Sequence, residues 1–445
     1  MSNPPKQIPK VQFIRFLRHA RRILKNPLPF HHRNFQKHGD TFELDLGFGN
    51  SAIFSRDARF AQYVLQKNQK NYTKSAIQTE DLAKYVGKGL LTTEGEHWRK
   101  QRRLIQPAFH KKQLLLILDA IQAAIDHEIA RVKIGEPFDV FPVFNDLAFQ
   151  TVVKALFTTE IPKSTIARLQ DITERAQMML VKELRQPYKS WWFKWGGAIK
   201  KHIDLVNEAR EILRTLVEER RAKKAKGDLL DMLLEARYED GSAMSEAQLL
   251  DEILILFVAG HETTSNALTF TTELLARHPK VQEKVYAEIS AAEPYTHDQM
   301  EFIKACPYTK QVIEESMRLY PPAYFIDRVN YEVDGWEGFD IPKGSNILFS
   351  IHEIHRHPDL WEQPEAFIPE RFASDKAKAY SSQYYPFGAG PRMCIGNNFA
   401  MLEMVLAIAS LVKKYHIDLK QTPIAFQPLI TLKPKDAILV FRKRS

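Results

Sequence analysis

Helical periodicity dominates the hydrophobic pattern between about residues 80 and 290. Apolar residues recur there at intervals of three and four, as they do along the buried face of an amphipathic helix. The pattern predicts long helices at Leu114–Val132, Phe144–Leu156, Lys163–Arg185, Lys200–Lys226, Ser245–Arg277 and Val281–Ala291. Helical character persists to about residue 319 and returns at Asn397–Tyr415.

Short strands are predicted elsewhere. Thr41–Asp57 alternates apolar and polar positions around a Gly-Phe-Gly-Asn turn, which is typical of a β-hairpin. Pro321–Phe349 and Ala425–Arg442 carry short β-branched or aromatic runs separated by turn residues. The sequence therefore predicts a mainly α fold with a minor β-rich subdomain, and no stretch marks a second domain.

Composition narrows the class of protein. With 445 residues, 44% hydrophobic and 26% charged, the chain is globular rather than collagen-like or disordered. Its net charge of +9 suits an acidic protein, an anionic membrane or a nucleic acid. No recognition module accompanies the basic residues, so we expect no nucleic-acid binding. Cys306 and Cys394 are the only cysteines, which excludes a disulfide-stapled scaffold and a Cys-rich zinc site.

Two segments raise the question of a membrane. No apolar run approaches the roughly 18 to 20 residues of a spanning helix, and the N-terminus does not resemble a signal peptide. Val11–Lys25, within a basic amphipathic N-terminal segment at residues 1–30, is either a peripheral membrane contact or, the alternative we favour, a helix packed on the body of the protein. Tyr188–Trp195 is equally consistent with a lipid interface and with an aromatic plug under a loop.

The loop around Cys394 carries the strongest chemical signal. Glycines and prolines constrain Tyr385–Gly396, and a predicted helix follows at once, so its N-terminal N–H groups favour a thiolate. Gly390 allows the backbone to approach a flat group, while Phe387 supplies an aromatic face and Arg392 a cation. This combination fits the axial ligand of a haem, although an inert cysteine in a Gly-rich turn remains the alternative.

A second motif lies in the apolar helix Ile253–Ser265. Gly260 interrupts it, which weakens a helix by about 1 kcal/mol and here makes room for a planar group or small ligand. Glu262 and Thr263 follow and form a plausible proton relay, in which the hydroxyl holds water and the carboxylate connects to solvent. An ordinary polar helix face is the alternative.

Two further patterns are weak by themselves. Glu315 and Arg318 form an i, i+3 pair, and Arg371 in Pro-Glu-Arg-Phe offers a second cation for a buried triad. Trp98 and Arg102 share a helix face and suit the carboxylates of a cofactor. For the second pattern taken alone, a solvated basic face is the better interpretation.

Taken in order, these motifs resemble the cytochrome P450 family over nearly the whole chain. The pattern Phe-x-x-Gly-x-x-x-Cys-x-Gly is met at residues 387–396, and Ala/Gly-Gly-x-Asp/Glu-Thr-Thr/Ser is met at 259–264. Glu-x-x-Arg, Pro-Glu-Arg-Phe and Trp-x-x-x-Arg are met at residues 315–318, 369–372 and 98–102. Arg328, six residues after Pro322, falls where the family has another haem-propionate contact.

The resemblance implies a single cytochrome P450 domain over residues 1–445 and a haem-thiolate monooxygenase that uses haem b (iron protoporphyrin IX). It implies Cys394 as the axial ligand of the iron, with Phe387 and Gly260 against the cofactor. The relay residues Glu262 and Thr263 would deliver protons. Propionate contacts would come from Trp98, Arg102, Arg328 and Arg392, and the structural triad would be Glu315, Arg318 and Arg371.

It also implies external partners. Electrons would come from a ferredoxin or flavodoxin with its NAD(P)H-dependent reductase, steered to the basic surface at Arg99–Lys112. We expect a cytoplasmic monomer whose membrane contact is at most peripheral, acting on O2 and a small organic substrate. Pocket-lining stretches would be Ser75–Leu91, Phe257–Thr264, Ala323–Ile326 and Leu429–Leu432, including the polar residues Gln78, Thr79, His261 and Tyr324.

Several activities remain open. Hydroxylation of an aliphatic C–H in a fatty acid or terpenoid ranks ahead of oxidative O-demethylation of a methoxylated sugar or aromatic, which would release formaldehyde. A peroxygenase or isomerase commonly lacks the acid–alcohol pair that this chain has. A non-catalytic haem sensor would bind haem without turnover, and a DNA-binding helical protein would bind no haem.

Overall fold

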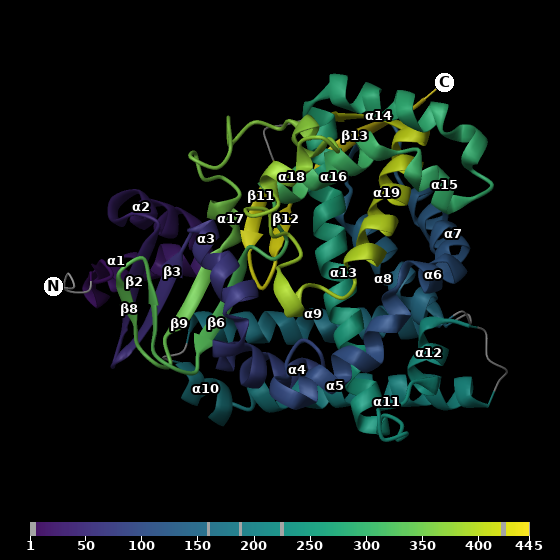
Figure 1. Ribbon diagram of the computed structural model, residues 1–445. Helices are drawn as coiled ribbons and strands as arrows, with labels where there is room; N and C mark the ends of the chain where they lie inside the picture. Colours follow the sequence, from purple (N-terminus) through teal and green to yellow (C-terminus); the bar gives the residue numbers. More distant parts are fainter. Residues whose placement is uncertain (1–5, 158–160, 187–188, 223–226, 420–423, 445) are drawn as a thin grey trace. The chain divides into compact units, whose positions relative to one another are not determined.

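The computed structural model describes residues 6–157, 161–186, 189–222, 227–419 and 424–444 (Figure 1). The chain divides into two compact units that interleave along the sequence. Unit 1 comprises residues 1–75, 311–394 and 425–435, and unit 2 comprises residues 76–310, 395–424 and 436–445.

Helices make up most of the described chain. Their bounds are α1 Phe13–Lys25, α2 Leu28–His38, α3 Ala58–Gln62, α4 Ala83–Val86, α5 Gly95–Ile105, α6 Lys111–Leu114, α7 Leu118–Ile129, α8 Phe141–Leu156, α9 Lys163–Arg185, α10 Ser190–Trp195, α11 Ala198–Arg221, α12 Leu229–Glu235, α13 Glu246–Arg277, α14 Pro279–Ala291, α15 Gln299–Lys304, α16 Pro307–Leu319, α17 Ile351–Ile354, α18 Ala377–Tyr380 and α19 Asn397–Lys414.

Unit 1 holds most of the strands. A six-stranded sheet has the order β1-β2-β3-β9-β6-β4, and β7–β8 and β11–β12 form separate antiparallel pairs. The strands of unit 1 are β1 Lys10–Val11, β2 Thr41–Gly47, β3 Asn50–Ser55, β4 Tyr72–Thr73, β6 Phe325–Asn330, β7 Asp334–Trp336, β8 Phe339–Ile341, β9 Asn346–Ser350, β11 Ala425–Pro428 and β12 Leu432–Lys435. The predicted hairpin is β2–β3, and β9 pairs with β3 in parallel.

Two apolar clusters stabilise this sheet in unit 1. One surrounds Phe60, Val64 and Phe349, and the other surrounds Phe35, Phe42 and Phe54. These aromatic side chains are almost fully buried, so each removes a large apolar area from water. The second cluster also holds α1 against the sheet through Phe16 and Ile23.

Unit 2 is helical around α13, which packs against α8, α11, α14 and α19. Ser245 is the N-cap of α13, because its hydroxyl accepts a hydrogen bond from the Gln248 N–H at 3.3 Å. A three-stranded sheet, β10-β13-β5, completes the unit. Its strands are β5 Pro137–Asp139, β10 Tyr415–Leu419 and β13 Ile438–Lys443.

Most predicted helices agree with the observed bounds to within a few residues. The prediction for Leu114–Val132 is partly wrong, because α6 ends at Leu114, a 3₁₀ turn follows, and α7 begins at Leu118. The helix predicted at Lys200–Lys226 ends at Arg221 as α11, and residues 223–226 lie outside the described part of the chain. Within the described residues, none of the helices combines the length and apolar character needed to cross a bilayer.

Candidate active site

The loop before α19 exposes the Cys394 thiol in unit 1. A 3₁₀ turn at Gly390–Arg392 leads into it, and the Cys394 N–H donates to the carbonyl oxygen of Phe387 at 2.9 Å. Cys394 is exposed, whereas Cys306 is buried. Burial, together with the charge of Glu288, raises the pKa of the Cys306 thiol to about 12. Only Cys394 therefore has the exposure that a metal ligand needs, and Cys306 is a core residue.

Glycines in this loop serve two different purposes. Gly390 has a φ of +70°, and a Cβ there would lie 1.9 Å from the carbonyl oxygen of Leu65 in the π-helix Tyr63–Lys67. Glycine is therefore required at position 390 because the loop touches the backbone of Leu65 there. Gly396 differs, since a Cβ there would meet no atom within 4 Å. Open space at Gly396 suits the close approach of a flat group.

Two cations of unit 1 lie where burial disfavours their charge: Arg328 is buried and Arg392 is half-buried. Burial lowers the pKa of Arg392 to about 10. Burial also lowers the pKa of Arg328, whose Nη1 donates to the carbonyl oxygen of Asp327 at 2.7 Å. A guanidinium shielded from solvent is stabilised most by a carboxylate partner. Phe387, the aromatic residue expected beside the cofactor, is half-buried.

A buried ion-pair cluster joins Glu315, Arg318 and Arg371 in unit 1. Arg318 donates from Nε to Glu315 Oε2 at 2.7 Å and from Nη2 to Oε1 at 2.9 Å, and Arg371 Nε lies 3.4 Å from the same Oε1. Arg318 also donates to the carbonyl oxygens of His355, Pro364 and Ala366. The cluster thus ties residues 355–371 to α16, a structural rather than a chemical role.

In unit 2, α13 leaves a narrow stripe accessible among buried neighbours. Leu256, Ala259, Gly260 and Thr263 follow the i, i+3, i+4, i+7 spacing of one helix face. Thr263 Oγ1 donates to the carbonyl oxygen of Ala259 at 2.8 Å. With its proton engaged in that bond, the hydroxyl oxygen accepts hydrogen bonds from the open side of the stripe.

Gly260 of this stripe and the two residues that follow it lie against or within the helical core. A Cβ on Gly260 would lie 2.8 Å from Val152 Cγ2, so the glycine permits close packing of α13 on α8. His261, expected to line the pocket, is buried, with Nδ1 2.7 Å from the carbonyl oxygen of Phe257 and its ring against Phe149. That expectation is wrong because His261 points into the helical core. Glu262 is also buried.

Trp98 and Arg102 lie one turn apart on α5 in unit 2. The indole of Trp98 is buried, and Arg102 Nε donates to Gln106 Oε1 at 3.2 Å. The basic surface that continues from α5 is partly neutralised, because Arg99 lies 3.5 Å from Glu96 and Arg103 lies 2.6 Å from Glu239. Its remaining exposed cations are Lys100, Lys111 and Lys112.

Two of the expected pocket-lining stretches meet in unit 1. The Tyr324 hydroxyl donates to the carbonyl oxygen of Leu429 at 2.7 Å, and the Leu432 N–H donates to that of Pro322 at 3.0 Å. Since its hydroxyl is engaged with the backbone, Tyr324 joins Ala323–Ile326 to Leu429–Leu432.

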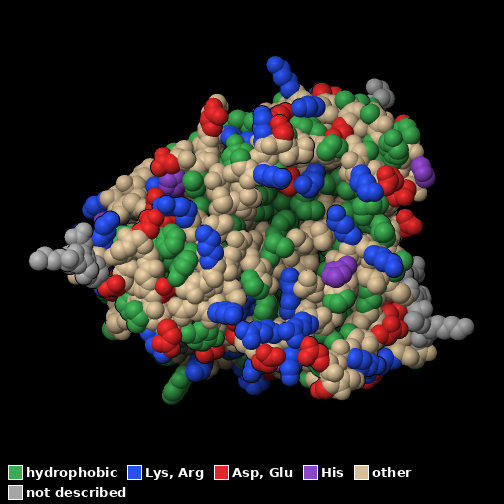
Figure 2. Space-filling model, in the orientation of Figure 1, with side chains coloured by type: hydrophobic (Ala, Val, Ile, Leu, Met, Phe, Trp, Pro, Cys, Tyr) green, Lys and Arg blue, Asp and Glu red, His purple; other side chains and the backbone are tan. Residues whose placement is uncertain are grey.

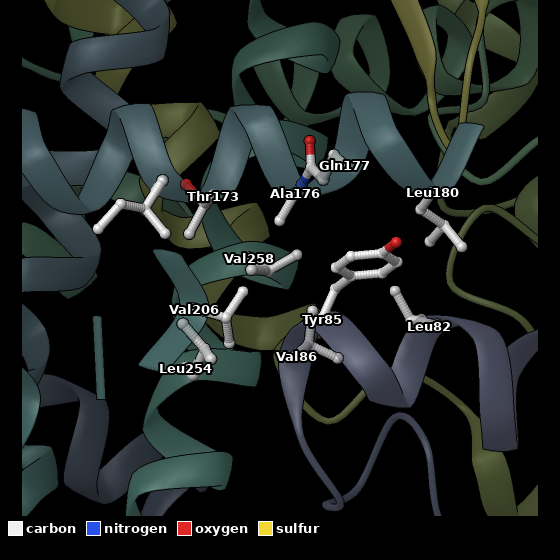
Figure 3. Close-up of a pocket in the computed structure, with 11 residues that line it drawn as sticks. Leu82, Tyr85, Val86, Thr173, Ala176, Gln177, Leu180, Val206, Leu254 and Val258 are labelled. Carbon is white, nitrogen blue, oxygen red and sulfur yellow. The ribbon is translucent and has the colours of Figure 1, made fainter. Parts of the chain in front are cut away.

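Within unit 2, an apolar cavity lies between α4, α9, α11 and α13 (Figure 3). Its volume of about 10 Å³ is room for a single water, so it holds no substrate. Leu254 and Val258, which line it, lie on a different face of α13 from the open stripe. Tyr85 also lines it, and its hydroxyl donates to Glu183 Oε2 at 2.5 Å. This cavity therefore marks tight packing of α4 and α9 rather than a ligand site.

Sequence reasoning missed one buried acid. Glu403 on α19 is fully buried, contacts the Thr151 hydroxyl of α8, and leaves Oε2 without a hydrogen-bond partner among the described residues. Burial raises the pKa of Glu403 to about 8, so the side chain is mostly protonated at neutral pH. An acid within the otherwise apolar run of α19 was the available signal.

The residues fit a haem. An exposed thiol stands just before the N-terminus of α19, open space lies beside Gly396, and shielded guanidinium groups suit the two propionates. A thiolate ligand, carboxylate-binding cations and a hydroxyl on an open helix face are the groups that oxygen activation at iron requires.

Comparison with known proteins identifies the family of this chain. The cytochrome P450 family model matches residues 4–441. Cyclooctat-9-en-7-ol 5-monooxygenase of Streptomyces melanosporofaciens is 30% identical, covering 90% of this chain and 87% of that protein. Pentalenene oxygenase of Streptomyces avermitilis is 28% identical, covering 90% and 89%.

Solved structures agree on the fold. The cytochrome P450DA heme domain superposes with a TM-score of 0.87 at 22% identity, covering 100% of this chain and 98% of that one. The retinoic acid bound cyanobacterial CYP120A1 gives a TM-score of 0.85 at 25% identity, with 99% and 100% coverage. The predicted mainly α fold with a minor β-rich part is confirmed, and the chain belongs to the cytochrome P450 family as a haem b-dependent monooxygenase.

Proposed function

We propose that this enzyme hydroxylates an aliphatic C–H bond of a terpenoid-class molecule, using O2 and electrons from an external protein. The observation that carries the proposal is the exposed thiol of Cys394 at the start of α19, in a chain of this family. When bound, haem supplies a thiolate-ligated iron at which O2 is activated.

Unit 1 contributes the ligand and part of the propionate contacts in this proposal. Cys394 binds iron as a thiolate, which the N–H groups at the α19 N-terminus stabilise. Arg328 and Arg392 pair with propionates, because a carboxylate stabilises a guanidinium whose charge burial disfavours. Trp98 and Arg102 of unit 2 take the same propionate-binding role, by their match to the family motif.

Proton delivery falls to Thr263 and Glu262 on α13. The Thr263 hydroxyl holds a water on the open stripe by accepting its hydrogen bond, and it delivers a proton when it rotates away from the Ala259 carbonyl. Glu262 is the neighbouring acid that resupplies the proton. The pair thus moves protons at Thr263 Oγ1 without exposing the whole helix to water.

An apolar substrate is favoured by the accessible surface of α13. Leu256 and Ala259 flank Thr263 on the open stripe, and neither offers a polar side chain to a ligand. The names of two relatives give cyclooctat-9-en-7-ol and pentalenene as their substrates, and both compounds are terpenoid hydrocarbons or alcohols. Fatty acids form the next substrate class to test.

A ferredoxin or flavodoxin is the proposed electron donor. Lys100, Lys111 and Lys112 are exposed cations that suit an acidic partner, whereas Arg99 and Arg103 are already paired with acids. Replacing the three lysines with glutamine should raise the KM for an acidic ferredoxin and weaken its salt dependence, with substrate binding unchanged.

The test of the activity is turnover under ¹⁸O2 with a ferredoxin, its reductase and NADPH, using pentalenene and a medium-chain fatty acid. One ¹⁸O atom in an alcohol product, absent with Cys394→Ser, supports hydroxylation. A methoxylated aromatic is tested in parallel. Formaldehyde from that compound, with no alcohol from pentalenene or the fatty acid, would replace the proposal by O-demethylation. Bound haem without product under any condition would favour a sensor.

A further inference from the structure

Helix α1 presents two distinct faces in unit 1. Phe16 and Ile23 pack against the aromatic cluster around Phe42, so the alternative of a helix packed on the body is correct for this face. The opposite face is exposed. It consists of Ile14, Leu17, Arg18, Arg21, Arg22 and Lys25, spaced as neighbours along one side of a helix.

The cations of this outer face carry no counter-charge. The helix contains no acidic residue, and none of Arg18, Arg21, Arg22 and Lys25 forms an ion pair with the described residues. Exposed arginines elsewhere do pair, as Arg103 does with Glu239 at 2.6 Å. Blue and red side chains lie side by side over much of the surface in Figure 2. The outer face of α1 is therefore complementary to an anionic partner.

Exposed apolar side chains adjoin these cations. Ile14 and Leu17 are 64% and 52% exposed, and Phe48 at the tip of the β2–β3 hairpin is 98% exposed. Phe48 has a φ of 54°, which is unfavourable for a bulky residue. The hairpin packs against Phe13 of α1. A Cβ added to Gly47 would lie 2.8 Å from the Phe13 ring, and the rings of Phe13 and Phe48 are in contact.

We propose that this surface binds an anionic phospholipid bilayer peripherally. Cations next to exposed apolar and aromatic side chains match the charged headgroups and acyl boundary of such a bilayer. An acidic protein would satisfy the cations, but it does not explain Phe48 held at the hairpin tip in an unfavourable conformation. If the substrate is apolar, as in the proposed function, binding to the bilayer places the enzyme where such molecules concentrate.

An independent observation concerns α10 in unit 2. Trp191, Trp192 and Trp195 are 62%, 62% and 89% exposed, so the aromatic-plug alternative is wrong for the described part of Tyr188–Trp195. Tyr188 itself lies outside the described residues. Hydrophobic side chains project where α10 lies (Figures 1 and 2). Exposed tryptophans beside Lys194 are typical of a membrane–water interface. We propose α10 as a second lipid contact.

Vesicle co-sedimentation of the haem-loaded enzyme tests the α1 surface. The probe is phosphatidylcholine vesicles with and without phosphatidylglycerol, at low and high salt. Arg18→Gln/Arg21→Gln/Arg22→Gln keeps helix propensity and removes three charges. The matched control, Lys100→Gln/Lys111→Gln/Lys112→Gln, removes the same charge from unit 2. A third variant, Ile14→Ser/Leu17→Ser/Phe48→Ser, removes the exposed apolar groups, and the haem spectrum of every variant reports folding.

The wild type should bind anionic vesicles in a salt-sensitive manner. A contribution of about fivefold per cation predicts about 100-fold weaker binding for the arginine variant and wild-type binding for the lysine control. The serine variant should bind at least tenfold more weakly. Absence of binding, equal loss in the lysine control, or full binding by the serine variant overturns the proposal; the last would identify an acidic macromolecule as the partner.

Fluorescence tests α10 separately, because its tryptophans are three of the six in the chain. Trp98 and Trp361 are buried and Trp336 is partly buried, so brominated lipid should quench mainly the α10 emission. Trp191→Phe/Trp192→Phe/Trp195→Phe should remove most of that quenching. Quenching as strong in this variant as in the wild type would show that the α10 tryptophans stay out of the bilayer, whatever α1 does.

Discussion

Replacing Gly390 with alanine, compared with the same change at Gly388, isolates one steric contact of the cysteine loop. Both glycines have a φ of +70°. Alanine in this left-handed conformation costs about 1–2 kcal/mol at either position. At Gly388 the new Cβ meets only Ile326 Cδ1, at 3.7 Å, which is ordinary contact. Gly388→Ala should therefore destabilise the protein by about 1–2 kcal/mol.

At Gly390 the new Cβ would lie 1.9 Å from the carbonyl oxygen of Leu65, a backbone atom that no side-chain rotation can move. The loop or the π-helix at Tyr63–Lys67 must shift by about an ångström, and overpacking of this kind costs about 1–3 kcal/mol more. The total for Gly390→Ala is then about 2–5 kcal/mol. Because the Cys394 N–H is bonded to Phe387 in the same loop, the variant should also retain less haem.

Urea unfolding of both haem-loaded variants, with haem content from the absorbance ratio of the Soret band to protein, measures the difference. We expect Gly390→Ala to be less stable than Gly388→Ala by about 1–3 kcal/mol and to lose haem first. Equal stability of the two variants would refute the contact between the cysteine loop and Leu65.

Three other variants probe the remaining groups. Thr263→Ala should keep substrate binding but consume NADPH with little product, measured as the product-to-NADPH ratio; tight coupling would exclude the relay. Glu315→Gln should lower the free energy of unfolding by about 3–5 kcal/mol, because it leaves two buried guanidinium groups without their carboxylate. A urea midpoint equal to that of the wild type would contradict this. Glu403 keeps its proton to a pKa of about 8 when folded but loses it near 4.5 when unfolded, so folding stability falls as pH rises between those values. Glu403→Gln should remove this pH dependence. Its free energy of unfolding, measured by urea titration, should therefore rise relative to that of the wild type by about 2–3 kcal/mol from pH 5 to pH 7. The same pH dependence in both proteins would show that Glu403 is ionised when folded.

Periodicity predicted the long helices because their apolar stripes and end signals are local. The prediction at Lys163–Arg185 coincides with α9, and Ser245 caps α13 at its predicted start. The sheet β10-β13-β5 was not foreseen as a unit, since its strands come from residues 137–139, 415–419 and 438–443. Pairing between segments so far apart in the sequence leaves no local signal, and β5, with three residues, is too short to show an alternating pattern.

For the candidate site, the sequence predicted which residues matter, but it did not show the packing contacts that each of them makes. Gly260 and Gly390 were attributed to a cofactor, a role that stays a prediction, and the structure adds a second reason for each glycine, because a Cβ would collide with Val152 or Leu65. His261 turns into the core because α8 covers its face of α13, which helical periodicity alone does not reveal. The roles of Cys394, Thr263 and the propionate-binding residues, and the single-domain organisation, stay predictions.

The iron ligand is tested by the absorption spectrum of the reduced enzyme with carbon monoxide, for the wild type and Cys394→His. We expect a strongly red-shifted Soret band for the wild type, typical of a thiolate ligand, and a band at the position of a histidine-ligated haem for the variant. A histidine-type band in the wild type, or a red-shifted band that survives in Cys394→His, would contradict the assignment of Cys394 as the iron ligand.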